Sequence, residues 1–323
     1  MKIKTKIESK RSSKNIIWKS LIFLKDIVWS FSEWFQERFV RERNGEYDHN
    51  YKERLLIKKC YFAYSADPKI RFSASSGGFC KSFLMYLIEN KIVDKAIITR
   101  MPENSFSAET IITDKRDEIT SSATNSIYAP TNPLDVLNKL KSSEKYVFIG
   151  LPCQCKVIKQ LQNQGKYKNI EIIINLFCNQ SPKIEYTYRL LDKIKVAKDD
   201  VKRIEYRGNG WPGYFTAYLK NGDKKQIIQN EAWSYAKDYF VEVCKHCNLL
   251  PVYADFSVGD PWGSGFNYNK DGSGLSVVIC SNANAQKIIK NAQKKKYIHL
   301  HRCSDWKMIN IFPRFLKEKL NRT

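Results

Sequence analysis

Two apolar runs, each followed closely by a cysteine, constrain the fold of this 323-residue chain more than any other feature. Residues 146–149 are β-branched and aromatic, and residues 170–177 are almost continuously apolar, as in parallel strands buried on both faces. Residues 157–164 carry helical spacing, so the whole segment predicts a β-α-β unit. Cys153 and Cys178 then follow the carboxyl ends of the two strands, where open α/β sheets form their binding sites.

Strand and helix patterns alternate through the rest of the chain, and they predict an α/β fold with a mixed, largely parallel sheet and flanking helices. Further strands are expected over 60–64, 93–99 and 275–280, and helices over 78–89 and 134–141. Residues 201–225 predict paired strands around a turn at 221–223, and the last residues predict a basic surface helix.

Residues 14–39 predict one long amphipathic helix that precedes this fold, because apolar residues recur there at three- and four-residue steps. Charged residues interrupt the stripe, so we expect neither a signal peptide nor a membrane span. The helix could pack on its own domain, dock a partner, or make peripheral contact with a membrane. A polar break at 41–52 predicts a boundary between a basic helix, 1–45, and a main domain, 46–323.

The formal net charge of +22 favours acidic partners such as nucleic acid, anionic lipid, an acidic protein or a polyanionic cofactor. No nucleic-acid-binding signature is present in the sequence, so we expect no nucleic-acid partner. Nine cysteines without a secretory signal argue against a disulfide framework. We therefore expect reduced thiols or a metal site in a cytoplasmic protein, one that could be peripheral at the inner face of the membrane.

The pair Cys244 and Cys247 is the strongest local signal, because two intervening residues allow both thiolates to reach one metal or cluster. A zinc ribbon would need a second such pair, whereas Cys153 and Cys155 have a single residue between them. Combining Cys244 and Cys247 with Cys153 and Cys178 supplies the four thiolates of a cubane cluster. On spacing alone, ordinary buried thiols remain the alternative.

Several motifs in register resemble the coenzyme F420 hydrogenase/dehydrogenase beta-subunit family, over about residues 60–280. The motifs are Ser73 to Gly78, Gly150 to Gln154, Phe177-Cys178, Arg207 to Gly213, Cys244 to Cys247 and Ala254 to Gly263. The resemblance implies an iron-sulfur flavoprotein with FAD and a [4Fe-4S] cluster. It also implies that Cys153, Cys178, Cys244 and Cys247 bind the cluster, and that the other five cysteines are structural.

Two departures from the family pattern stand out. No cysteine precedes Cys60, so we expect a short form that lacks the N-terminal ferredoxin-like module and resembles members found with polysaccharide biosynthesis genes. Leu151 stands where a threonine is usual, which would alter a hydrogen bond near the cluster without removing a ligand.

Three motifs suggest a flavin site. Ser75, Ser76, Gly77 and Gly78 open a helix, where serines can cap and free amides suit a phosphate, although a plain capped helix has the same pattern. Arg207 could bind phosphate or carboxylate and Trp211 could stack on a ring, but a tight hairpin with a core tryptophan fits equally. Arg207 and Asp260 are also the candidate catalytic residues, although an acid such as Asp260 is commonly a turn former.

The resemblance therefore implies a flavin- and iron-sulfur-dependent reductase or dehydrogenase. It would pass electrons between the cluster, FAD and an organic small-molecule acceptor such as coenzyme F420. With a ferredoxin-like module missing, an acidic ferredoxin would supply electrons in trans, guided by the basic surface. The alternative is a non-catalytic accessory protein of a membrane-associated polysaccharide pathway.

Overall fold

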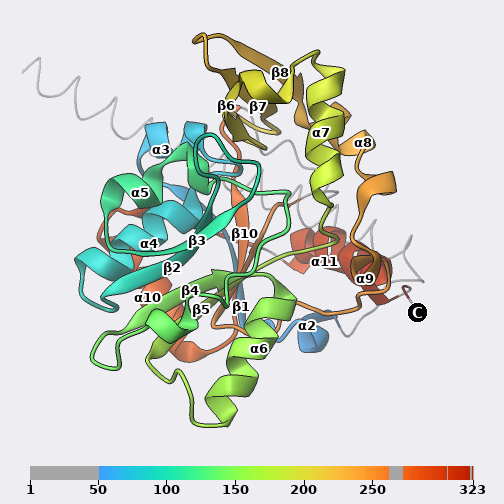
Figure 1. Cartoon of the computed structure of the whole chain (residues 1–323). Coiled ribbons are helices and arrows are strands. Elements are labelled where there is room, and N and C mark those ends of the chain that lie inside the picture. The colour runs from blue at the N-terminus through green and yellow to red at the C-terminus, as the bar shows by residue number, and fades with distance from the viewer. Residues whose placement is uncertain (1–50, 262–271, 304, 321, 323) are drawn as a thin grey trace, which may run out of the picture.

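The computed structural model describes residues 51–261, 272–303, 305–320 and 322. In this part of the chain, one eight-stranded sheet has the order β11-β1-β10-β9-β5-β4-β2-β3 (Figure 1). Its strands in chain order are β1 Lys59–Ser65, β2 Lys95–Arg100, β3 Glu109–Thr113, β4 Tyr146–Gly150, β5 Ile170–Leu176, β9 Phe256–Gly259, β10 Ser276–Cys280 and β11 Ile298–Arg302. The predicted amphipathic helix at 14–39, and with it the 1–45 domain, lies outside the described residues.

Four neighbouring strands, β9, β5, β4 and β2, are parallel, and they form the centre of the sheet. Helix α6 (Pro152–Asn163) connects β4 to β5, so the predicted β-α-β unit is confirmed. The sheet is mixed, because β3, β10, β1 and β11 pair antiparallel. The predicted fold class is therefore confirmed.

The antiparallel pairs bring one more strand end to the edge that matters for function. Strand β10 runs antiparallel to both β9 and β1, so β1 points in the same direction as the parallel block. The carboxyl ends of β1, β4, β5 and β9 consequently lie along one edge of the sheet, which we call the carboxyl edge. Candidate site residues follow each of these strands: Ser75 to Gly78 after β1 and α3 (Pro68–Ser73), Cys153 after β4, Cys178 after β5 and Asp260 after β9.

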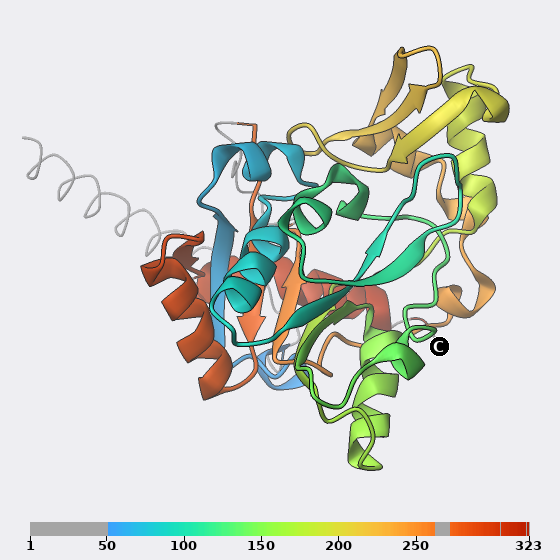
Figure 2. The ribbon, with the colours of Figure 1, turned by 60° about the vertical axis from the view of Figure 1, so that its left-hand side comes forward.

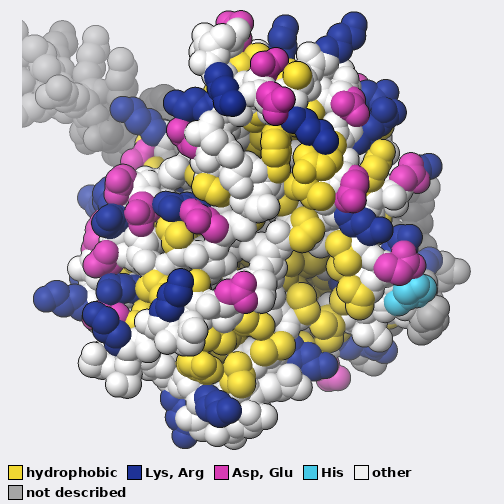
Figure 3. All heavy atoms as spheres, viewed as in Figure 1, with side chains coloured by type: hydrophobic (Ala, Val, Ile, Leu, Met, Phe, Trp, Pro, Cys, Tyr) yellow, Lys and Arg dark blue, Asp and Glu magenta, His cyan; other side chains and the backbone are white. Residues whose placement is uncertain are grey.

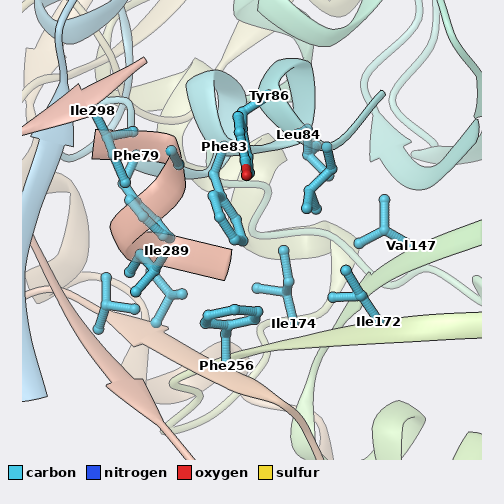
Figure 4. Packing of buried hydrophobic residues seen from close by; sticks show 14 of the residues in the cluster. Phe79, Phe83, Leu84, Tyr86, Val147, Ile172, Ile174, Phe256, Ile289 and Ile298 are labelled. Carbon is cyan, nitrogen blue, oxygen red and sulfur yellow. The ribbon is translucent and has the colours of Figure 1, made fainter. Parts of the chain in front are cut away.

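Helices cover both faces of the sheet because successive side chains of each strand point to opposite sides. On one face, α4 (Phe79–Glu89) and α10 (Ala283–Lys294) pack side by side (Figure 2). Phe83 of α4 meets Phe256 of β9 edge to face with ring centroids 4.9 Å apart, and both rings are fully buried (Figure 4). Burial of one such ring stabilises the fold by about 1.5–3 kcal/mol.

On the opposite face, α6 and α11 (Asp305–Leu320) bury Ile158 and Phe312 against the sheet. The predicted helix at the end of the chain is confirmed, and one of its faces is buried against the sheet. Met308, Phe312 and Leu316 recur at helical spacing and pack against Phe62 and its neighbours. The many basic residues of this helix made its apolar stripe hard to recognise in the sequence.

A second, three-stranded antiparallel sheet lies beyond the carboxyl edge, at the top of Figure 1. It contains β6 (Val201–Glu205), β7 (Tyr214–Leu219) and β8 (Lys224–Ile228), as the paired-strand pattern predicted. Helices α7 (Ile184–Lys193) and α8 (Gln229–Ser234) share a buried core with it. The loop after β6 returns to the large sheet and carries Arg207.

One predicted helix is largely absent from the described chain. Residues 134–141 form only a short 3₁₀ turn at Leu137–Lys139. The Asn132 side chain accepts a hydrogen bond from the Leu134 amide, which forms a local turn that competes with a helix. Only Val136 and Leu137 of this stretch are buried, so packing does not favour a longer helix.

The remaining short helices are connectors between the larger elements. They are α2 Tyr51–Arg54, α3 Pro68–Ser73, α5 Arg116–Thr120 and α9 Glu242–Lys245. Among the described residues, none of the helices is long and apolar enough to cross a membrane.

Candidate functional site

The four candidate ligand cysteines come from three segments of the chain. Cys153 is the second residue of α6 and is exposed, and Cys178 follows β5 by two residues. Cys244 lies in α9, and Cys247 follows it with its amide donating to the Cys244 carbonyl at 3.4 Å. The first two therefore extend from neighbouring parallel strands, as the sequence predicted.

Electrostatic coupling indicates that the four thiols share one neighbourhood. Burial raises the pKa of Cys178 to about 12, Lys319 opposes this rise, and charge on the other three thiols adds to it. Burial likewise raises the pKa of Cys153, with Cys247 and Cys244 acting in the same direction. Negative charge on any one sulfur thus disfavours charge on the others unless a cationic group is bound among them.

Four thiolates are a donor set that an iron-sulfur cluster uses. Among the described residues, no group of three or more His, Cys, Asp or Glu side chains could hold a metal ion. A cluster has iron and sulfide atoms of its own, so its four ligand sulfurs stand farther apart than those around one ion. Thiolates are also the ligands that iron-sulfur clusters use.

Of the other five cysteines, four are buried and Cys80 is half-buried. Cys155, two residues after Cys153, is fully buried and its Sγ lies 3.9 Å from the Ile174 carbonyl oxygen. Cys60, Cys280 and Cys303 are buried in the core. Burial raises the pKa of Cys80 on α4 to about 12.

A buried arginine joins three of the predicted motifs. Arg207 donates from Nη1 to Asp260 Oδ2 at 2.5 Å and from Nη2 to the Ser75 carbonyl at 2.8 Å. Its Nε donates to the Pro212 carbonyl at 3.1 Å, and the residue is only 3% exposed. Although burial acts in the opposite direction, Asp260 and Tyr128 raise the pKa of Arg207. The ion pair therefore connects the loops after α3, β6 and β9 at the carboxyl edge.

The family model for the C terminus of the coenzyme F420 hydrogenase/dehydrogenase beta subunit matches residues 143–305, and the model for its N-terminal part matches residues 60–138. The chain belongs to this family. The expected short form without an N-terminal module is corrected, because the family's N-terminal part begins at Cys60 itself and is present.

Curated members of the F420 hydrogenase/dehydrogenase beta-subunit family are distant in sequence. A coenzyme F420-dependent sulfite reductase of Methanocaldococcus jannaschii is 23% identical, over 83% of this chain and 42% of its own length. The beta subunit of an F420-dependent formate dehydrogenase of the same organism is 24% identical, over 75% of this chain and 61% of its own length. The chain thus spans about half the length of these two relatives.

A solved structure has a similar fold. A chain of the F420-reducing [NiFe] hydrogenase complex from Methanosarcina barkeri, studied by xenon derivatization, superposes with a TM-score of 0.64 at 18% identity. The match covers 82% of this chain and 89% of that one. At this level of identity the likeness establishes the fold.

The Ser75–Gly78 motif differs from its predicted local structure. Helix α4 begins after Gly78, and no side chain caps it. Ser75 Oγ instead accepts from the Ser126 amide at 2.7 Å, and Ser76 Oγ donates to the Leu275 carbonyl at 2.7 Å. The predicted serine cap is therefore wrong, because both hydroxyls attach the loop to distant segments.

The two glycines of this motif are required by close packing. Gly77 and Gly78 have φ of +66° and +67°, a region that favours glycine. A Cβ on Gly77 would lie 2.6 Å from the Leu275 Cα, and one on Gly78 would lie 2.9 Å from the Ile70 carbonyl oxygen. The glycines thus allow the loop to pack on α3 and on the start of β10.

Trp211 lies in the Arg207–Gly213 loop and is half-buried. Its amide donates to the Gly272 carbonyl at 2.8 Å, and its ring packs so closely on Gly274 that an added Cβ there would lie 2.9 Å from Cδ1. Stacking of the ring on a flavin stays a prediction. Trp262 and Gly263 of the last family motif lie outside the described residues.

A hollow with hydrophobic walls lies between the three-stranded sheet and the region of α6 and α9 (Figure 3). A separate depression of about 440 Å³ is lined by Lys159, Gln162 and Asp255, among others, at the opposite edge of the large sheet. None of the predicted site residues lines that depression. The hydrophobic hollow is the better candidate for a flat organic cofactor.

Leu151 is the N-cap residue of α6, with φ −80° and ψ 163°, and no side chain caps the helix there. Gln154 Oε1 accepts from the Leu151 amide at 2.7 Å. A threonine hydroxyl could accept from an amide of the first turn, so Leu151→Thr is expected to raise the free energy of unfolding by about 1 kcal/mol. Urea denaturation measures this change. Leu151→Val is the matched control, and an equal effect of both substitutions would contradict the capping explanation.

Proposed function

We propose that this chain is an electron-transfer flavoprotein whose [4Fe-4S] cluster is bound by Cys153, Cys178, Cys244 and Cys247. The geometry that supports the proposal is that Cys153 and Cys178 follow the neighbouring parallel strands β4 and β5. The Lys319 ammonium also contacts the carbonyls of both Asn179, which follows Cys178, and Cys247. Relatives named as F420-dependent oxidoreductases and subunits support a redox role. When bound, such a cluster accepts and donates single electrons.

The same proposal includes FAD at the carboxyl edge. The first turn of α4, preceded by Gly77 and Gly78, would bind a phosphate through its amides and the helix dipole. Trp211 would stack on the flat ring system. Arg207 and Asp260 would fix the three loops that surround it, because their hydrogen bonds join those loops. Flavin accepts a hydride as two electrons, and a cluster passes electrons singly.

The acceptor is proposed to be an organic molecule such as coenzyme F420 or another small substrate. The names of these relatives point to F420. The net charge of +22 favours an acidic electron donor, for which ferredoxin is the natural class. Oppositely charged partners associate faster at low salt, because screening shortens the reach of surface charge.

The experiment measures flavin reduction by reduced ferredoxin in anaerobic protein at increasing NaCl concentration. We expect the second-order rate constant to fall by about tenfold or more between low and high salt. An uncharged mediator is the control and should show little change. A ferredoxin rate that does not depend on salt would contradict the electrostatic steering. Protein that contains neither flavin nor cluster would instead favour the non-catalytic accessory role.

A further inference from the structure

The last turn of α11 contacts two segments that contain proposed cluster ligands, the one with Cys178 and the one with Cys247. Lys319 is 1% exposed, although it is a lysine near the end of the chain. Its Nζ donates to the Asn179 carbonyl at 3.1 Å and to the Cys247 carbonyl at 3.3 Å. One buried ammonium thus connects the loop after β5, which carries Cys178, to the segment that carries Cys247.

The same ammonium also points at a ligand sulfur. The distance from Lys319 Nζ to Cys247 Sγ is 3.6 Å, which is within hydrogen-bonding range for sulfur. An ammonium has three N–H donors and no acceptor. Two carbonyl oxygens and one cysteine sulfur therefore face these three donors, so the buried ammonium has a partner for each N–H.

Neighbouring residues reinforce this attachment at Asn179. Arg322 Nη1 donates to the Asn179 carbonyl at 2.6 Å, and Nη2 donates to Asn179 Oδ1 at 3.1 Å. Asn179 Nδ2 donates to Glu318 Oε2 at 2.7 Å. Asn179 directly follows Cys178 in the sequence. The end of the chain consequently holds the backbone beside one predicted ligand at several points.

We propose that Lys319 is a positioning residue of the cluster site. It holds the Cys178 and Cys247 segments together and places a fixed positive charge beside the Cys247 sulfur. Reduction adds one electron to the cluster and forms or breaks no bond. A nearby cation and a hydrogen bond to a ligand sulfur stabilise the reduced state, so Lys319 raises the reduction potential. This inference rests on the proposed cluster.

The test compares Lys319→Met with the wild-type chain in anaerobically purified protein. Methionine keeps an unbranched chain of similar length but removes the charge and the donors. Potentiometric titration followed by electron paramagnetic resonance gives the midpoint potential. We expect the equilibrium to shift about tenfold toward the oxidised cluster, which is a midpoint about 59 mV more negative. Iron retention during dialysis against a chelator should also fall.

Lys317→Met is the matched control, because Lys317 lies on the same helix and is exposed. It should leave both the potential and the iron retention unchanged. Should Lys319→Met fail to fold, Lys319→Gln keeps donors without the charge and should show the same lowered potential. A folded, cluster-containing Lys319 variant with wild-type potential and iron retention would overturn the inference. Wild-type protein without iron and sulfide would instead refute the proposed cluster itself.

Discussion

Replacing Arg207 with alanine is expected to lower the free energy of unfolding by about 3–5 kcal/mol, because it breaks a buried ion pair. The substitution leaves the Asp260 carboxylate, only 14% exposed, without its guanidinium partner. It also removes donors to the Ser75 and Pro212 carbonyls. Urea denaturation followed by circular dichroism measures the change. Flavin content should fall in parallel, because three loops of the proposed flavin site lose their common connection.

Arg116→Ala is the matched control for this prediction. Arg116 pairs with Glu89 at 2.8 Å, but its side chain is 61% exposed. Exposed pairs typically contribute about 0–1 kcal/mol. Equal destabilisation by Arg207→Ala and Arg116→Ala would show that Arg207 does not organise the carboxyl edge.

Cys247→Ser is expected to remove most of the iron and sulfide from the protein. A serine hydroxyl is a poor replacement for a thiolate ligand, and three remaining thiolates cannot complete the cluster's coordination. Iron and sulfide assays on anaerobically purified variants measure the loss. The same result is expected for Cys153→Ser, Cys178→Ser and Cys244→Ser.

Cys155→Ala is the control for the cysteine series, because Cys155 lies two residues from Cys153 and is buried against Ile174. It should keep its iron and sulfide. Full iron and sulfide content in Cys247→Ser would refute the ligand set, whereas loss in Cys155→Ala would indicate a general effect of cysteine removal on the fold.

The local sequence pattern was sufficient to predict the strands that precede Cys153 and Cys178. The apolar runs before Cys153 and Cys178 form β4 and β5, and these strands pair in parallel around α6. Buried parallel strands have a composition that few other elements share. The hairpin around Asn221-Gly222-Asp223 was predictable for a similar reason, since its turn residues favour the required backbone.

Long-range partners were not visible in the sequence. Ser75 and Ser76 have the pattern of helix caps, but their hydroxyls bond to Ser126 and Leu275 instead. Lys319 looks like one more basic residue in a basic tail, and only the buried stripe of α11 shows that it faces inward. Which side chain satisfies a distant polar group depends on tertiary packing, and residue spacing does not encode it directly.

We propose that four cysteines hold one iron-sulfur cluster. Counting iron and acid-labile sulfide per chain in anaerobically purified wild-type protein tests this proposal. About four of each are expected, with an electron paramagnetic resonance signal after reduction. Protein that folds normally but contains no sulfide, or holds zinc in place of iron, would contradict it.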